Sequence, residues 1–208
     1  MNAIRPERLG VFGGTYDPPH IGHLILAEEA LYQLQLDRIL WMLTPDPPHK
    51  IGREITDIGH RIEMLKLALA DEPCFELSYM DIHRPAPHYA ADTMQLLQLQ
   101  HPQSQWVYLM GGDSLSDLPT WMRPLEFVRA CDEIGVMLRP GHDIDLDVLE
   151  LALPGLKDKV RFLQAPLLEI SSTRLREKMA QGAAYRYYLL PSVYNYIENR
   201  QLYHKTLG

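Results

Sequence analysis

The most informative stretch of the sequence is Gly13-Gly14-Thr15-Tyr16-Asp17-Pro18-Pro19-His20-Ile21-Gly22-His23. It follows a short apolar run at 9–12 and leads into a helical pattern. This order is typical of a strand, a tight loop and a helix. Glycines accept positive φ and let the backbone approach a bulky anionic group closely. Pro18 and Pro19 suit the entry to a helix, and Asp17 is expected to cap its first amides. The stretch is therefore a candidate phosphate-binding loop.

Two histidines follow in the same stretch. His20 and His23 are three residues apart at the predicted helix start, so they share a face and point toward whatever the helix N-terminus binds. A pair of glycines after a strand is also common without any ligand, and two such histidines can be metal ligands. No Cys or carboxylate stands at a matching spacing, so we expect no protein-bound metal. The string fits neither the G-x-G-x-x-G fingerprint nor a P-loop.

Composition limits the class of protein. With 208 residues, 46% of them hydrophobic, the chain can bury one full core, and we expect a single domain over 1–208. The formal net charge of −7 argues against a nucleic-acid partner. The sequence shows neither a signal peptide nor an apolar run of membrane-spanning length, which predicts a cytoplasmic protein without a membrane partner. Cys74 and Cys131 form no C-x-x-C and are expected to be small buried residues.

Apolar runs alternate with helical patterns along the chain. The runs lie at 9–12, 39–43, 106–110, 134–138 and 160–163, with a weaker one near 75–80. Nearly continuous apolar runs of this length are typical of buried parallel strands. The alternation predicts an α/β fold with a doubly wound, mostly parallel, Rossmann-like sheet, which binds ligands beyond the carboxyl ends of its strands. Helices from about residue 171 are expected to pack on the sheet.

The unusual stretches fall just after predicted strands. Pro45-Asp46-Pro47-Pro48-His49-Lys50 brings one ammonium group to the strand ends, unless it is merely a solvated turn. Gly111-Gly112-Asp113 follows a later strand and leads to Trp121, a core aromatic or a flat ring that stacks on a heterocycle.

A further polar set stands near the C-terminus. Ser171 is a natural helix cap, and Leu175 and Met179 form an apolar stripe. Ser172 and Arg176 are four residues apart, so a hydroxyl and a guanidinium share one face near the helix N-terminus. Amides, a hydroxyl and an arginine fork make a strong oxyanion-binding set.

Together these motifs resemble the bacterial nicotinate mononucleotide adenylyltransferases, which belong to the nucleotidyltransferase superfamily with a T/H-x-G-H element. G-G-T-[FY]-D-P-x-H-x-G-H, P-P-H-K, G-x-D-S-L…W and I-S-S-T-x-[IL]-R all match. The resemblance implies three groups of site residues. The catalytic group is Thr15, His20, His23, Lys50 and Arg176; the ATP-binding group is Gly13, Gly14, Gly22, Gly111, Asp113, Ser171, Ser172 and Thr173; the nicotinate-nucleotide-binding group is Tyr89, Ala90, Trp121, Met122 and Arg139.

Three positions in or beside the last of these groups depart from the family pattern. The family usually has P-S-Y-T where this chain has Pro87-His88-Tyr89-Ala90, and often an aromatic residue where this chain has Met122. Contact with the nicotinate carboxylate survives at position 90 if the family's threonine acts through its main-chain N–H, and is lost if it acts through its side chain.

The resemblance implies that ATP and nicotinate mononucleotide give nicotinate adenine dinucleotide and pyrophosphate. A phosphate monoester is largely ionised at neutral pH, since its second pKa is about 6, and needs no general base to attack the α-phosphorus. Mg²⁺ is expected to bind through the ATP phosphates. The alternatives are a related enzyme acting on nicotinamide mononucleotide or phosphopantetheine, and a non-catalytic nucleotide-binding module. A homo-oligomer stays open.

Overall fold

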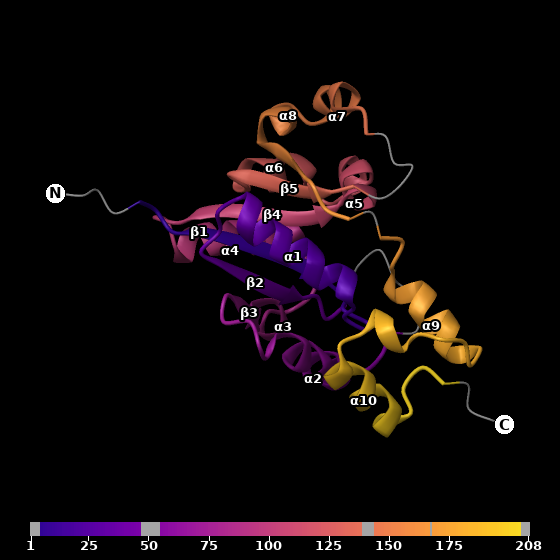
Figure 1. Cartoon of the computed structure of the whole chain (residues 1–208). Helices are drawn as coiled ribbons and strands as arrows, with labels where there is room; N and C mark the ends of the chain where they lie inside the picture. The colour runs from indigo at the N-terminus through magenta and orange to yellow at the C-terminus, as the bar shows by residue number, and fades with distance from the viewer. Residues whose placement is uncertain (1–4, 47–54, 139–143, 167, 205–208) are drawn as a thin grey trace.

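The computed structural model describes residues 5–46, 55–138, 144–166 and 168–204 (Figure 1). Six parallel strands form one sheet in the order β3-β2-β1-β4-β5-β6, which reverses direction between β1 and β4. This order confirms the doubly wound α/β fold, and the switch point lies beside the predicted phosphate-binding stretch. The strands are β1 (Arg8–Gly14), β2 (Arg38–Leu43), β3 (Phe75–Ser78), β4 (Gln105–Gly111), β5 (Glu133–Met137) and β6 (Val160–Leu163).

Helices cover both faces of the sheet (Figure 1). Buried side chains of α1 and α2 pack on one face, and those of α4 to α8 pack on the other. The helices and short 3-10 turns are α1 (Ile21–Gln33), α2 (Ile58–Leu69), α3 (Met80–His83), α4 (Ala90–Gln100), α5 (Gly112–Ser116), η2 (Leu118–Thr120), α6 (Pro124–Ala130), α7 (Leu146–Ala152), α8 (Leu156–Lys159), α9 (Ser172–Ala180), η3 (Arg186–Tyr188) and α10 (Pro191–Arg200).

Strand β4 shows why the apolar runs are nearly continuous. Trp106, Tyr108 and Met110 face one hydrophobic cluster, while Val107 and Leu109 face the other. Successive side chains of a strand point to opposite faces, so a strand covered by helices on both sides is apolar at every position.

The C-terminal helices pack against α2. Leu175 and Met179 of α9 and Val193 and Ile197 of α10 form a third cluster with Met64 of α2. The sequence analysis expected these helices on the sheet itself, but α2 already covers that part of the sheet. In this position α9 lies beside the loop that follows β1, to which Ser172 and Arg176 are hydrogen-bonded (Figure 1).

Two smaller features complete the fold. Cys131 is buried as expected, whereas Cys74 is only partly buried. Within the described part of the chain, no helix is long and apolar enough to cross a membrane.

Candidate active site

A cleft of about 600 Å³ opens at the carboxyl ends of the central strands, beside the switch point between β1 and β4. Twelve residues singled out from the sequence line it: Gly13, Gly14, Thr15, His20, Gly22, His23, Tyr89, Ala90, Gly111, Asp113, Trp121 and Met122. Motifs that are far apart in the sequence therefore meet in one concave site, as a doubly wound sheet requires.

The residues of α9 lie next to the cleft without lining it. The Ser172 hydroxyl donates to the Pro18 carbonyl at 2.9 Å, and Arg176 Nη1 donates to the Asp17 carbonyl at 2.7 Å. Ser171 caps α9 as expected, accepting a bond from the Arg174 N–H. Ser172 and Arg176 thus contact residues 15–19, the signature loop, while the Ser171 and Thr173 side chains bond within the start of α9. Lys50 and Arg139 lie outside the described residues.

Gly13 and Gly14 do not have the loop conformation that the sequence analysis expected. Both belong to β1 rather than to a loop, and neither has a positive φ. A Cβ at Gly13 would lie 2.5 Å from the Tyr108 hydroxyl, and a Cβ at Gly14 would lie 2.9 Å from the Tyr16 ring. The glycines are required because two aromatic side chains pack directly on the strand end, not because the backbone needs an unusual conformation.

The two histidines form one stacked unit at the start of α1. His20 is the N-cap residue and is 6% exposed, and its ring stacks on that of His23 with centroids 3.6 Å apart. The His20 backbone N–H donates to His23 Nδ1 at 3.2 Å. Because Nδ1 accepts this bond, the ring proton of neutral His23 is on Nε2. His23 therefore offers a hydrogen-bond donor through Nε2.

Asp17 does not cap α1, which corrects the sequence-based expectation. It precedes the N-cap residue by three positions and is only 3% exposed. Its carboxylate accepts bonds from the Tyr203 hydroxyl at 2.7 Å and from the Thr56 N–H at 3.3 Å. Asp17 thereby ties the signature loop to the approach to α2 and to the C-terminal segment, and Arg176 bonds to its carbonyl.

Arg61 is a second buried group of this kind, and the sequence analysis missed it. It is 3% exposed on α2, and its guanidinium donates to four main-chain carbonyls at 2.8 to 3.2 Å. Burial lowers its pKa, while the Asp17 charge opposes this shift. The carbonyls belong to the ends of the loops after β1 and β2 and before α2: Thr15, Thr44, Pro45 and Thr56. The position of this arginine on the apolar face of a helix was the sequence feature that could have indicated its buried role.

The other end of the cleft begins at α4. Tyr89 is the N-cap residue and Ala90 the first residue of this helix, and both line the cleft. Within the described structure no side chain caps α4. The first amides of a helix have no intrahelical partner and carry the positive end of its dipole. A ligand with an acceptor group can therefore serve as the missing cap.

Trp121 also lines the cleft. Its ring is held by Phe127 and Tyr108, with centroids at 5.3 and 6.3 Å. Met122 follows it and is 56% exposed. The ring therefore has a fixed orientation, although the loop that carries it is near the surface.

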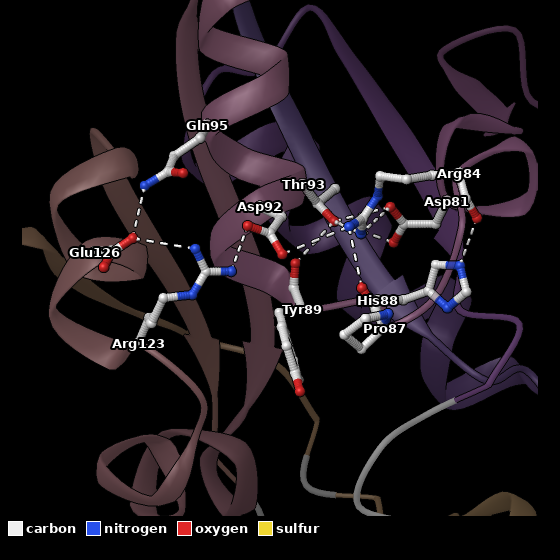
Figure 2. Close-up of polar contacts among 10 residues, drawn as sticks. All are labelled: Asp81, Arg84, Pro87, His88, Tyr89, Asp92, Thr93, Gln95, Arg123 and Glu126. Carbon is white, nitrogen blue, oxygen red and sulfur yellow. Dashed lines mark hydrogen bonds and ion pairs between the residues drawn. The ribbon is translucent and has the colours of Figure 1, made fainter.

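A buried polar cluster below the α4 N-terminus was also missed by sequence reasoning (Figure 2). The Thr93 hydroxyl lies 2.9 Å from Asp81 Oδ1, Arg84 Nη2 lies 3.0 Å from the same oxygen, and the His88 ring bonds to the Arg84 carbonyl at 3.0 Å. Asp81, His88 and Thr93 line the cleft. His88, a departure from the family pattern, thus helps to hold the chain that leads into α4.

The described residues contain no cluster of three or more His, Cys, Asp or Glu side chains suited to a metal ion.

Comparison with known proteins defines the class first. The family model described as Cytidylyltransferase-like matches residues 11–178, which run from β1 into α9. A protein of Thermomicrobium roseum named probable nicotinate-nucleotide adenylyltransferase is 44% identical over 197 residues, 95% of this chain and 92% of that protein. The nicotinate-nucleotide adenylyltransferase of Bacillus subtilis is 39% identical over 95% of this chain and 98% of its own length. The chain therefore belongs to the cytidylyltransferase-like family and, within it, to the nicotinate-nucleotide adenylyltransferases.

Solved structures agree on the fold. The nicotinic acid mononucleotide adenylyltransferase of Plasmodium falciparum, complexed with NaAD, has a TM-score of 0.81 at 18% identity, over 97% of this chain and all of that one. The same enzyme complexed with APC has a TM-score of 0.77 at 19% identity. At such low identity the likeness concerns the fold alone.

Proposed function

We propose that this chain joins ATP to nicotinate mononucleotide and releases nicotinate adenine dinucleotide and pyrophosphate. One observation carries the proposal: a single cleft at the switch point combines the stacked His20–His23 pair with the uncapped start of α4 and the fixed ring of Trp121. The first part suits phosphates, and the second suits a flat ring that bears an anion. The names of relatives at 36 to 44% identity support the same reaction.

The reaction needs alignment more than acid or base catalysis. The phosphate of a mononucleotide has a second pKa of about 6, so at neutral pH it is already a nucleophile. Its oxygen attacks the α-phosphorus of ATP, the bond to the bridging oxygen breaks, and pyrophosphate leaves. The protein must hold both substrates in line and stabilise charge on the transferring group.

His23 is the best-placed donor for that charge. The His20 N–H donates to His23 Nδ1 and so orients the ring, and His23 lines the cleft, where its Nε2–H would donate to the transferring phosphate. Thr15 and His20 line the same end and would share the α-phosphate. Lys50, Ser172 and Arg176 would take the remaining phosphates.

The nicotinate ring would occupy the other end. Its carboxylate would accept hydrogen bonds from the first amides of α4, and its ring would stack on Trp121. Ala90 lines the cleft as the first residue of this helix, so its main-chain N–H can act without the hydroxyl of the family's threonine. Asp113 and Gly111, also in the cleft, would contact the adenosine.

Mg²⁺ would be held by triphosphate oxygens and water, because it keeps much of its hydration and prefers oxygen ligands. It would supply charge neutralisation on the phosphates.

The test is pyrophosphate release from ATP with nicotinate mononucleotide, nicotinamide mononucleotide or phosphopantetheine as acceptor. We expect the fastest release with nicotinate mononucleotide. Release only with phosphopantetheine, or nucleotide binding without any release, would refute the proposal.

A further inference from the structure

The two walls of the acceptor end belong to separate elements. Tyr89 and Ala90 stand at the start of α4, whereas Trp121 and Met122 lie between η2 and α6. The width of this end therefore depends on what joins the two elements. Figure 2 shows a continuous row of charged side chains between them.

At the centre of the row, Asp92 of α4 lies between two arginines. Its Oδ1 accepts a bond from Arg123 Nη2, and its Oδ2 lies 3.6 Å from Arg84 Nη1. Arg84 continues to Asp81 at 3.0 Å, and Arg123 continues to Glu126 of α6 at 3.4 Å. The row thus reaches from the buried cluster below α4 to the first turn of α6.

Arg123 directly follows the cleft residues Trp121 and Met122. Its φ of 56° is in the left-handed region, which a residue with a Cβ adopts only when its surroundings impose it. Its guanidinium lies 5.8 Å from the centre of the Tyr89 ring. The Arg123 side chain thus contacts both Tyr89, the N-cap residue of α4, and Asp92 in the first turn of that helix.

We propose that Arg123 and Asp92 are positioning residues for the acceptor nucleotide, holding the Trp121 loop at a fixed distance from the α4 N-terminus. This inference rests on the proposed function. The ion pair between Arg123 and Asp92, the bridge, would set the width of the acceptor end of the cleft. Neither side chain lines the cleft, so both act through Tyr89, Ala90, Trp121 and Met122.

The bridge is suited to positioning rather than to overall stability. The side chains of Arg123 and Asp92 are 36% and 28% exposed. Partly exposed ion pairs contribute little to the free energy of unfolding. A shift of about 1 Å in a bound group can still cost a large factor in reactivity.

If the two residues acted only through their charges, the removal of Asp92 would have the opposite effect on mononucleotide binding. Nicotinate mononucleotide is an anion, so removing the Asp92 charge would strengthen its binding if only charge mattered. If the bridge sets the geometry, removing Asp92 weakens binding although the site becomes less negative. Arg123 alone cannot separate the two explanations, since both predict weaker binding when its charge is lost.

The experiment compares Asp92→Ala, Arg123→Gly and the double variant with the wild type. Glycine accepts the left-handed conformation at position 123, so this change removes the guanidinium without backbone strain. Glu63→Ala is the control, because it removes an exposed ion pair with Lys66 on α2 at 2.8 Å. The measurements are the Kd of nicotinate mononucleotide by calorimetry, the KM values of both substrates, kcat and the thermal midpoint.

We expect each single variant to raise the Kd and KM for nicotinate mononucleotide about 10-fold and to leave the KM for ATP within about twofold. The double variant should be no worse than the poorer single one, since both remove the same bridge. Glu63→Ala should bind like the wild type.

Tighter mononucleotide binding by Asp92→Ala, unchanged binding in both single variants, an equal loss for ATP, or additive losses would overturn the inference. A wild type that binds the mononucleotide but releases no pyrophosphate would refute the proposed function alone, because the Kd values still test the bridge. A wild type that binds no mononucleotide would overturn both.

Discussion

The two ends of the cleft are built differently. At the phosphate end, Asp17, His20 and Arg61 are almost fully buried, and the side chains of Asp17 and Arg61 bond mainly to main-chain atoms. At the acceptor end, the ring of Trp121 packs on Phe127 and Tyr108, but Met122 beside it is exposed and the Arg123–Asp92 bridge is partly exposed. On the proposed function, the residues that hold the phosphates are therefore fixed by the folded core, whereas those that hold the acceptor nucleotide rely in part on a partly exposed ion pair. Changes at the first end should harm turnover or folding, and changes at the second should alter specificity.

The largest effect is expected at the phosphate end. His23→Ala should lower kcat about 100- to 1000-fold, because it removes a preorganised donor to the transferring phosphate. The thermal midpoint should change little, since His23 is only partly buried. Steady-state kinetics and a melting curve test this. A folded variant with near-normal turnover would contradict the assignment of this end.

Arg61→Ala should be the most destabilising single change at this end. It leaves four carbonyls without their donor, and we expect a loss of about 3 kcal/mol in the free energy of unfolding. Arg38→Ala is the matched control, since it removes an exposed arginine paired with Glu7 and Glu76 and should cost less than about 1 kcal/mol. Urea unfolding gives both values, and equal losses would refute the role of Arg61.

Two arginines of α9 should differ clearly. Arg176→Ala should raise the KM for ATP about 10- to 100-fold, because a hydrogen bond to a charged phosphate is lost. Arg174→Ala should change it less than about twofold, since Arg174 pairs with Glu169 at an exposed position. If Arg174 were the more sensitive position, the alignment of residues 170–176 with the I-S-S-T-x-[IL]-R motif would be wrong.

The smallest of these effects concerns the hydrogen bond from Tyr203, in the C-terminal segment, to Asp17. Tyr203→Phe should lower the free energy of unfolding by about 1 kcal/mol, because the bond to Asp17 is lost. Tyr187→Phe, at an exposed position, should have no measurable effect.

The cost of Tyr203→Phe should also depend on pH. Burial, with the Asp17 charge, raises the pKa of the Tyr203 phenol, so its stabilising contribution is complete below about pH 10 and falls as the pH rises further. Denaturation at pH 8 and pH 10.5 tests this, and a cost that grows with pH would contradict it.

The sequence predicted the sheet because its signals are local. Continuous apolar runs marked the six strands to within two residues at their ends. β1 extends through Gly14 because the backbone remains extended beyond the last apolar residue. Twelve residues of the cleft were also predictable, since parallel strands end at one edge, whereas Asp81, His88 and Thr93 were missed. The roles of all the site residues stay predictions, and Lys50 and Arg139 also lie outside the described residues.

The supporting contacts were not predictable, because they join residues far apart in the sequence. Nothing in the local pattern indicates that Tyr203 reaches Asp17 or that Arg123 binds Asp92. Asp17 itself was misassigned, since an acidic residue near a helix start usually caps it, and here tertiary contacts use the carboxylate instead.

The most direct test of the central claim is the ratio of kcat/KM for nicotinate and nicotinamide mononucleotide at fixed ATP. A site lined with donors satisfies a carboxylate but leaves the NH₂ of a carboxamide facing another donor, and such mismatches discriminate strongly. The uncapped amides of α4 predict a ratio of at least about 100 in favour of nicotinate, despite Ala90 and Met122. A ratio near one, or one that favours nicotinamide, would contradict the account.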